Sequence, residues 1–354
     1  MGSKDALFLN PVTRELIVWA SDILPIRKDM WHKFQEYLAG SWPTCDRQYS
    51  NSQKHKLYRD FMRVYMREGF NLVDYFSYAF VSLSKEERST YISEFDRGRL
   101  HRIVNNEKYN SCVADKVLFD TKYKKYIMRD WMVVNGAEDK AAFMTFLDRH
   151  GSIVVKPRDG QKGNGVELIS VSSQKDKEDI WKKVLKNTLL AEEVIVQHES
   201  IAAFHPESVN TVRISTAIDS QGNVHLMSSV IRVGNGGSNV DNGSAGGLFC
   251  GIDIESGMII SPGIDLKARR FLTHPTTGQS FLGFIIPQWE ELKKLAVEVA
   301  LVTPQLRYIG WDWVLTKDRK WELLEGNEPG GVHILQQGAG RGMKKEYEAV
   351  LIKD

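Results

Sequence analysis

Two carboxylates and one amide near the end of the chain have the spacing of a metal site. Asp312 lies in the run YIGWDWVLT (308–316), and Glu325 and Asn327 lie in WELLEGN (321–327). The intervening KDRK predicts a hairpin turn, which would place Asp312 and Glu325 on neighbouring strands with Asn327 beyond them. Alternate strand residues share a face, so Glu325 and Asn327 point the same way, and such oxygen donors suit Mg²⁺. The plainer alternative is a strand that runs into a turn of Asn, Pro and Gly.

The neighbours of Asp312 strengthen the metal hypothesis. Trp311 and Trp313 would face the opposite side of the strand, which leaves Asp312 as the one carboxylate on its own face. An unpaired buried carboxylate is costly, and we expect a metal ion to relieve that cost. Glu328 points to the other face by parity and is expected to be solvated.

A second candidate site is the segment KPRDGQKGNGV (156–166). Lys156 ends an apolar strand, and the loop after it contains Gly160, Lys162, Gly163 and Gly165. Glycines let a backbone approach phosphate oxygens closely, and lysine supplies a point charge for a polyphosphate. The GxxxxGK[ST] pattern is absent, so this is not a P-loop, and taken alone the segment is also compatible with an ordinary loop.

Two arginines lie within strand-like runs between these segments. Arg213 is in TVRISTAI (211–218) and Arg232 is in NVHLMSSVIRV (223–233). Arginine on an inward strand face usually binds a carboxylate or a phosphate. A surface salt bridge is the alternative for each.

The elements that must position these residues change character near residue 110. Residues 1–110 contain few glycines and many aromatics and are predicted to be helical, with a capping-box spacing of Ser84 and Glu87 at one helix start. Beyond 110 we expect strands at 152–157, 189–197, 211–218, 223–233, 308–316 and 321–327, and helices at 176–187 and 289–302. The segment 219–224 is a plausible hairpin turn, and 234–247, with six glycines, is expected to be a loop. This arrangement predicts an α+β fold.

Composition narrows the function classes. The chain has 354 residues, a 42% hydrophobic share and a net charge of +2, which indicates a globular protein and does not favour nucleic-acid binding. Its three cysteines are far apart, and there is no signal peptide or apolar run of spanning length, so we expect a cytoplasmic protein. The segment 44–67 has six basic residues against two acidic ones, and is either a solvated helix face or a surface for an anionic partner such as a polyanionic acceptor or lipid head group.

The order of these motifs resembles the ATP-grasp superfamily. A lysine, a glycine loop, a Glu-Glu pair, two strand arginines, an Asn-Gly-rich loop, an aspartate and Glu-x-Asn follow one another along the chain. The runs SVNTVRI, VDNGSAGG, CGIDIESG, HPTTG and IGWDWVLTKDRKWELLEGN are similar, more narrowly, to the sugar-transfer-associated ATP-grasp subfamily, which is found with polysaccharide biosynthesis genes. The resemblance covers about residues 110–340.

The resemblance implies roles for individual residues. Lys116 and Lys156 would hold ATP phosphates beneath a lid formed by loop 160–165. The backbone of Glu192, Glu193, Val194 and Ile195 would hold the base, Glu199 the ribose, and Asp312, Glu325 and Asn327 the Mg²⁺. Arg232, Asn242 and Gly246–Gly247 would steady the γ-phosphate, Arg213 would contact phosphate or acceptor, and His198 has no assigned role.

The implied fold is two α+β subdomains clamping ATP, at 111–191 and 192–354, after a helical domain at 1–110 that replaces the family's usual first domain. The implied activity is an ATP-dependent carboxylate–amine ligase that works through an acyl-phosphate, joining an amino acid or amine to a sugar acid or similar carboxylate in surface polysaccharide biosynthesis. A phosphotransferase acting on a hydroxyl and a non-catalytic nucleotide-binding protein are the alternatives. A peripheral membrane association or lipid-linked acceptor stays open, and the sequence does not indicate the oligomeric state.

Overall fold

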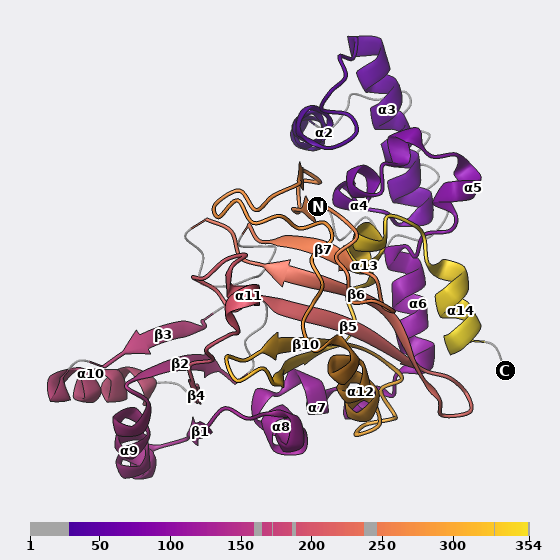
Figure 1. The fold of residues 1–354 in the computed structure, drawn as a ribbon. Coiled ribbons are helices and arrows are strands. Elements are labelled where there is room, and N and C mark those ends of the chain that lie inside the picture. The colour runs from indigo at the N-terminus through magenta and orange to yellow at the C-terminus, as the bar shows by residue number, and fades with distance from the viewer. Residues whose placement is uncertain are drawn as a thin grey trace.

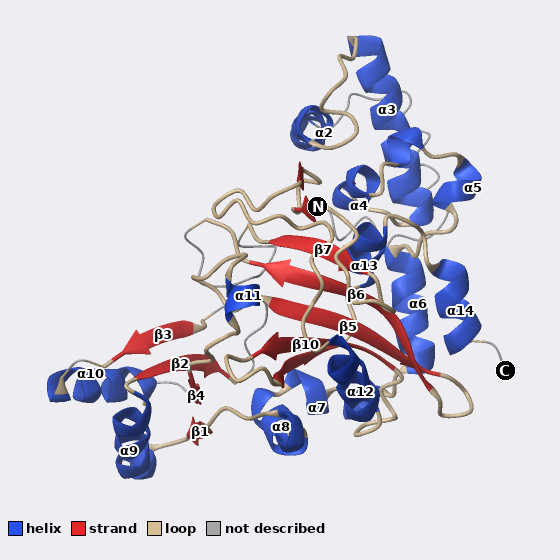
Figure 2. Ribbon diagram, in the orientation of Figure 1, coloured by secondary structure: helices blue, strands red, loops and turns tan. Residues whose placement is uncertain are grey.

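The computed structural model describes residues 28–158, 165–171, 173–185, 189–236, 246–328 and 330–352. The predicted site residues Gly160, Lys162, Gly163 and Asn242 lie outside these ranges. Figure 1 shows two sheets of unequal size with a helical region at the N-terminal end, and Figure 2 shows the same view by secondary structure. No helix within the described ranges is long and apolar enough to cross a bilayer.

The first part of the described chain is helical, as predicted. Its main helices are α2 (Lys28–Gly40), α3 (Asn51–Arg63), α4 (Leu72–Ser77), α5 (Lys85–Arg88) and α6 (Glu94–Val104). The starts of α3, α4, α5 and α6 each have a capping box, in which the N-cap side chain and the residue three positions later satisfy each other's backbone N–H groups. A mainly aromatic cluster, with Phe34, Phe61 and Tyr75 fully buried, packs α2, α3 and α4 together, whereas Leu100 and Val104 of α6 belong to another cluster.

The smaller sheet has the strand order β1 (Trp131–Val134), β4 (Leu189–Glu193), β2 (Ser152–Pro157), β3 (Glu167–Ser170), and all pairs are antiparallel. Helices α9 (Lys140–His150) and α10 (Gln174–Val184) cover one face, where Phe143, Ile153 and Val155 are buried. Alternation along β2 and β4 therefore directs Lys156 and Glu192 to the other face. The sequence analysis assigned no element to β1 or α9.

The larger sheet has the order β11 (Trp321–Asn327), β10 (Tyr308–Leu315), β5 (Thr211–Ile218), β6 (Val224–Val233), β7 (Leu248–Ile252), β8 (Gly263–Ile264), β9 (Arg270–Phe271). Helix α12 (Trp289–Ala300) packs on one face of its central strands, and α13 (Val332–Ala339) and α14 (Lys344–Leu351) pack on the other. Trp311 and Trp313 are buried on the α12 side, so the alternate residues of β10 face the α13 side.

One predicted strand is divided between the two sheets. The strand-like run 189–197 was expected to be a single strand, but β4 ends at Glu193. Residues after it pair with the end of β10 instead, because Gln197 bridges Thr316 and the His198 N–H donates to Leu315 O. This run is therefore the connection between the sheets, and the proposed domain boundary at 191 falls two residues before the end of β4.

Candidate active site

Asp312 is the centre of a charged cluster on the larger sheet. Arg213 donates through Nε to Asp312 Oδ1 at 2.6 Å and through Nη2 to Oδ2 at 2.6 Å, and Arg232 Nη1 donates to Oδ2 at 2.7 Å. Asp312 is fully buried. Burial alone would raise its pKa, but the two guanidinium groups outweigh that effect and lower the pKa of Asp312 to about 2.

The strand register explains why these side chains meet. Asp312 of β10 lies directly opposite Arg213 of β5 on one side and Glu325 of β11 on the other. Arg232 lies on the next strand, paired with Thr211, and reaches Asp312 diagonally. Asp312 was expected to be unpaired, and that expectation was wrong, because the two strand arginines already satisfy its carboxylate.

Glu325 and Asn327 complete the cluster. A bulge in β11 puts Leu323 opposite Trp313 but Glu325 opposite Asp312, which brings Glu325 onto the face of Asp312. Asn327 Nδ2 donates to Asp312 Oδ2 at 3.1 Å and to Glu325 Oε1 at 3.2 Å. Burial of the Glu325 carboxyl and the adjacent Asp312 charge raise the pKa of Glu325, although half of this side chain's surface is exposed.

The donor set fits a hard cation. Two carboxylates and an amide within hydrogen-bond reach of one another provide the oxygen ligands that Mg²⁺ takes together with phosphate oxygens. Within the described ranges, no three His, Cys, Asp or Glu side chains gather into a metal-binding group. A metal here would therefore depend on the Asn327 amide oxygen and on ligands supplied by a substrate.

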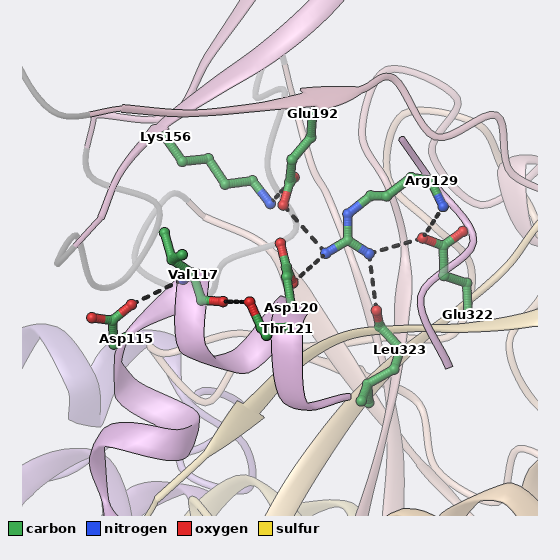
Figure 3. A network of polar contacts seen from close by, with 9 residues as sticks. All are labelled: Asp115, Val117, Asp120, Thr121, Arg129, Lys156, Glu192, Glu322 and Leu323. Atoms are coloured by element: carbon green, nitrogen blue, oxygen red, sulfur yellow. Dashed lines mark hydrogen bonds and ion pairs between the residues drawn. The ribbon is translucent and has the colours of Figure 1, made fainter. Parts of the chain in front are cut away.

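A second buried network links the two sheets (Figure 3). Lys156 of β2 forms an ion pair with Glu192 of β4 on the open face of the smaller sheet. Arg129 contacts the other oxygen of Glu192 at 3.2 Å, Asp120 of α8 (Lys116–Lys122) at 3.3 Å and Glu322 of β11 at 2.8 Å. The side chains of Arg129, Asp120, Glu192 and Glu322 are at most 4% exposed. Arg129 thus connects the face that carries Lys156 to the strand that carries Glu325.

The two carboxylates beside Arg129 are perturbed in opposite directions. Burial opposes ionisation of Glu192, but the charges of Arg129 and Lys156 prevail and lower its pKa to about 2. For Asp120 burial dominates over the attraction of Arg129 and raises the pKa to about 6. Sequence reasoning did not single out Arg129, Asp120 or Glu322; the only local signal was the charge of Glu322 inside the apolar run WELL.

Lys116 lies beside the strand of Lys156. It is the first residue of α8, whose N-cap Asp115 accepts from the N–H groups of Val117 and Leu118. Lys116 Nζ donates to Pro157 O at 3.1 Å, so both predicted phosphate-binding lysines lie where the glycine segment leaves β2. Gly165, at the far end of that segment, has φ +75°, and a Cβ there would lie 2.7 Å from Pro157 Cγ.

The predicted base and ribose residues follow one another along the connection between the sheets. Glu193 exchanges backbone and side-chain hydrogen bonds with Asp130, and the half-buried Val194 and Ile195 lie just beyond the end of β4. Glu199 is exposed as the first residue of α11 (Glu199–Ala202). The structure gives His198 a local role, since its Nδ1 accepts from the N–H of Ser200 and caps this helix.

The structure also describes the predicted residues Gly246 and Gly247 and the residue Glu328. Gly246 and Gly247 border the described end of the glycine-rich loop, and Gly246 has φ +93°. Glu328 was expected to be solvated, which was wrong: its side chain is 7% exposed and contacts His101 of α6 and Asn105, the residue after α6. Parity along β11 did not reveal these contacts, because β11 ends at Asn327 and the partners of Glu328 are more than 200 residues away in the sequence.

Several solved structures are similar to this chain in fold. An ATP-grasp ligase named PsnB, complexed with minimal precursor, matches at 15% identity and a TM-score of 0.44 over 70% of this chain and 63% of that one. D-alanyl-alanine synthetase A from Vibrio cholerae matches at 12% identity and 0.41, over 65% and 60%. N5-carboxyaminoimidazole synthetase from Staphylococcus aureus, complexed with ADP, matches at 11% and 0.40, over 64% and 47%. The chain thus spans less than two thirds of each of these structures.

A comparison with curated proteins gives no significant match. A family model described as sugar-transfer associated ATP-grasp matches residues 95–351, which is most of the chain and includes both sheets and α6. The chain therefore belongs to the sugar-transfer associated ATP-grasp family.

Proposed function

We propose that the chain is an ATP-dependent carboxylate–amine ligase. The observation that carries this proposal is the cluster of Asp312, Glu325 and Asn327 with two arginines on one face of the larger sheet. This cluster combines donors for a cation with donors for phosphate oxygens. Binding a nucleotide alone would not require both.

The protein's side chains would act mainly by positioning and by neutralising charge. Lys116 and Lys156 would hold the phosphates of ATP, and Arg213 and Arg232 would face the phosphoryl group being transferred. Asp312, Glu325 and Asn327 would hold Mg²⁺, which when bound supplies charge neutralisation at the phosphate oxygens. Glu192 would orient Lys156 through their ion pair.

The proposed reaction has two steps. A substrate carboxylate oxygen bonds to the γ-phosphorus as the bond to ADP breaks, which gives an acyl-phosphate. An amine nitrogen then bonds to the acyl carbon, phosphate leaves, and the amine loses a proton to form the amide. Exclusion of water protects the intermediate from hydrolysis. The family's association with sugar transfer supports an acid such as a uronic acid as one substrate and an amino acid or other amine as the second.

The proposed setting is the cytoplasm, where ATP is available. All three cysteines are free, and the structure separates exposed Cys45 from buried Cys250. A peripheral or lipid-linked acceptor stays compatible with this setting, and we expect no nucleic-acid partner.

The decisive experiment is hydroxylamine trapping. Purified protein with ATP and Mg²⁺ is incubated with a panel of uronic acids, nucleotide-sugar acids and amino acids, and hydroxamate and ADP are measured, followed by mass spectrometry with candidate amines. A ligase yields a hydroxamate and later ADP, phosphate and an amide. A kinase yields a phosphorylated product with no free phosphate and no hydroxamate, and that result would replace the ligase proposal with the phosphotransferase.

A variant pair tests the residue assignment. Glu325→Gln should reduce turnover by at least about 100-fold while ATP still binds, because one anionic ligand for the metal is lost. Glu348→Gln, which removes a surface ion pair between Glu348 of α14 and Arg99 of α6, is the matched control and should keep wild-type turnover. Wild-type turnover in Glu325→Gln would remove Glu325 from the proposed metal set.

A further inference from the structure

Helix α6 makes a buried polar contact with the strands that carry the candidate metal ligands. Asn105, which follows α6 and is 5% exposed, donates from Nδ2 to Tyr308 O at 3.0 Å and accepts at Oδ1 from the Tyr308 N–H at 2.8 Å. Its Nδ2 also donates to Glu328 Oε1 at 2.9 Å. One side chain therefore holds both the first residue of β10 and the residue that follows β11.

The contact is next to the proposed site in sequence and in register. Tyr308 precedes Asp312 by four residues on β10, and Glu328 directly follows Asn327. Gly310, between Tyr308 and Asp312, is paired with Asn327 across the two strands. Because the hydrogen bond from Asn105 holds Glu328 in place, the backbone at Asn327 cannot move away from Asp312 unless this hydrogen bond breaks.

Glu328 has a second partner on the same helix. His101 Nδ1 lies 2.7 Å from Glu328 Oε1, and the Glu328 side chain is 7% exposed. A nearly buried carboxylate is stable only when polar groups surround it, and here both partners come from the α6 region. The Glu328 carboxylate is thus held by polar groups in a nearly buried position, unlike an ion pair at the protein surface.

Helix α6 is attached to the rest of the protein by other contacts besides those with Glu328. Lys344 Nζ of α14 contacts both carboxylate oxygens of Asp96, at 2.8 and 2.9 Å, and Arg99 pairs with Glu348 at 2.8 Å. The match to the family model begins at residue 95, so α6 lies within the family's shared region, whereas the described helices before it do not. Because these pairs already attach α6 to α14, the contacts with Glu328 are not needed to hold the helix in place and can have another role.

We propose that Asn105 and His101, acting through Glu328, are positioning residues that hold Asn327 in place to bind the metal. This proposal depends on the proposed function, because it assumes a metal–nucleotide complex at Asp312, Glu325 and Asn327. Partners that orient a metal ligand typically change metal affinity by about 10- to 100-fold when removed. We expect loss of these partners to weaken metal binding and not nucleotide binding, because the lysines predicted to bind the nucleotide are on other elements.

The test uses Mn²⁺ as the probe and needs no knowledge of the substrates. Mn²⁺ binding to the full chain is measured by electron paramagnetic resonance with a non-hydrolysable ATP analogue present, and analogue binding is measured separately without metal. Glu328→Ala and Asn105→Ala should weaken Mn²⁺ binding about tenfold and leave metal-free analogue affinity within about twofold. Glu328→Gln keeps an acceptor for Asn105 and should restore Mn²⁺ affinity to within about threefold of the wild type.

A control variant on α6 distinguishes a loss of metal-ligand positioning from a general loss of protein stability. Asp96→Asn removes the contact with Lys344 and should lower the melting temperature with no change in Mn²⁺ affinity. If Glu328→Ala binds Mn²⁺ like the wild type, or loses Mn²⁺ and metal-free nucleotide binding together, the positioning role is refuted. If the wild-type chain itself holds no Mn²⁺ with the analogue, the proposed function fails first, and the two failures are therefore distinguishable.

Discussion

The buried network around Arg129 predicts that one of its carboxylates destabilises the protein at alkaline pH. Arg129 and Lys156 provide two positive charges, and Asp120, Glu192 and Glu322 provide three negative ones when all are ionised. Asp120 is the carboxylate whose pKa is raised, to about 6. Asp120→Asn should therefore stabilise the protein at pH 8, whereas Glu192→Gln should destabilise it.

The sign follows from proton linkage. Because the folded-state pKa of Asp120 lies above its unfolded value of 3.8, its favourable contribution is complete below pH 4 and is lost as the pH rises through 6. That shift corresponds to about 3 kcal/mol at pH 8, and a weaker hydrogen bond from Arg129 to the amide offsets about 1–2 kcal/mol of it. The expected net gain for Asp120→Asn is thus about 1 kcal/mol at pH 8, and it should become a loss near pH 4–5.

Glu192 obeys the opposite rule. Its folded-state pKa of about 2 lies below the unfolded 4.5, so its contribution is present above pH 4.5 and is lost only as the pH falls through 2. Glu192→Gln should therefore cost about 3 kcal/mol at pH 8. Both side chains are almost fully buried, so solvent screens these charges little.

The assay is urea denaturation of both variants and the wild type at pH 4, 5, 6, 7 and 8, followed by tryptophan fluorescence. Asp148→Asn is the matched control, because Asp148 is 62% exposed and its ion pair with Lys177 is at the surface. Its effect should be small and independent of pH. The reasoning is refuted if Asp120→Asn destabilises at pH 8 as much as Glu192→Gln does, or if its effect does not change sign toward acid pH.

Three further predictions concern packing, thiol reactivity and ligand coupling. Gly251→Ala should lower the melting temperature by more than about 5 °C, because the new Cβ would lie 2.1 Å from Gly338 O; a shift below about 2 °C would contradict this close approach. Cys45 is exposed, whereas Cys250 is fully buried with its pKa raised by burial, so Ellman's reagent should label Cys45 in the native protein and Cys250 only in denaturant; rapid native labelling of Cys250 would be inconsistent with this core. An ATP analogue and Mg²⁺ together should raise the melting temperature by more than the sum of their separate effects, and a merely additive shift would oppose a shared site.

Local sequence signals predicted the elements whose partners are close along the chain. The strands at 211–218 and 321–327 match β5 and β11, because alternating apolar residues and turn residues next to them determine a hairpin locally. The same logic predicted that Asp312 and Glu325 lie opposite each other, and the register confirms this placement. Their role as metal ligands stays a prediction.

Features that depend on contacts between residues far apart in the sequence could not be predicted from local sequence patterns. Arg129 is separated from Asp120 by 9 positions, from Glu192 by 63 and from Glu322 by 193, so no local pattern links them. The run 189–197 contains enough apolar and β-branched residues to predict one strand, and only the position of the second sheet decides that its end pairs with residues near Leu315. The burial of Glu328 also depends on distant residues, since its partners His101 and Asn105 lie more than 200 positions earlier in the sequence.

The cluster at Asp312 resolves an apparent conflict between two sequence predictions. Asp312 and Glu325 were predicted to bind a metal, and Arg213 and Arg232 to bind phosphate, yet in the protein these arginines contact Asp312. Two arginines facing two carboxylates give a cluster that is close to neutral without any ligand. A divalent cation alone would add uncompensated positive charge beside the guanidinium groups, and a polyphosphate alone would add negative charge beside the carboxylates. Together the two ligands partly neutralise each other, and phosphate oxygens would take over the guanidinium hydrogen bonds that Asp312 gives up if it binds the metal. The four side chains satisfy each other in the free protein, and under the proposed assignment they would also bind a metal–nucleotide pair, in which case binding of the two ligands would be mutually dependent.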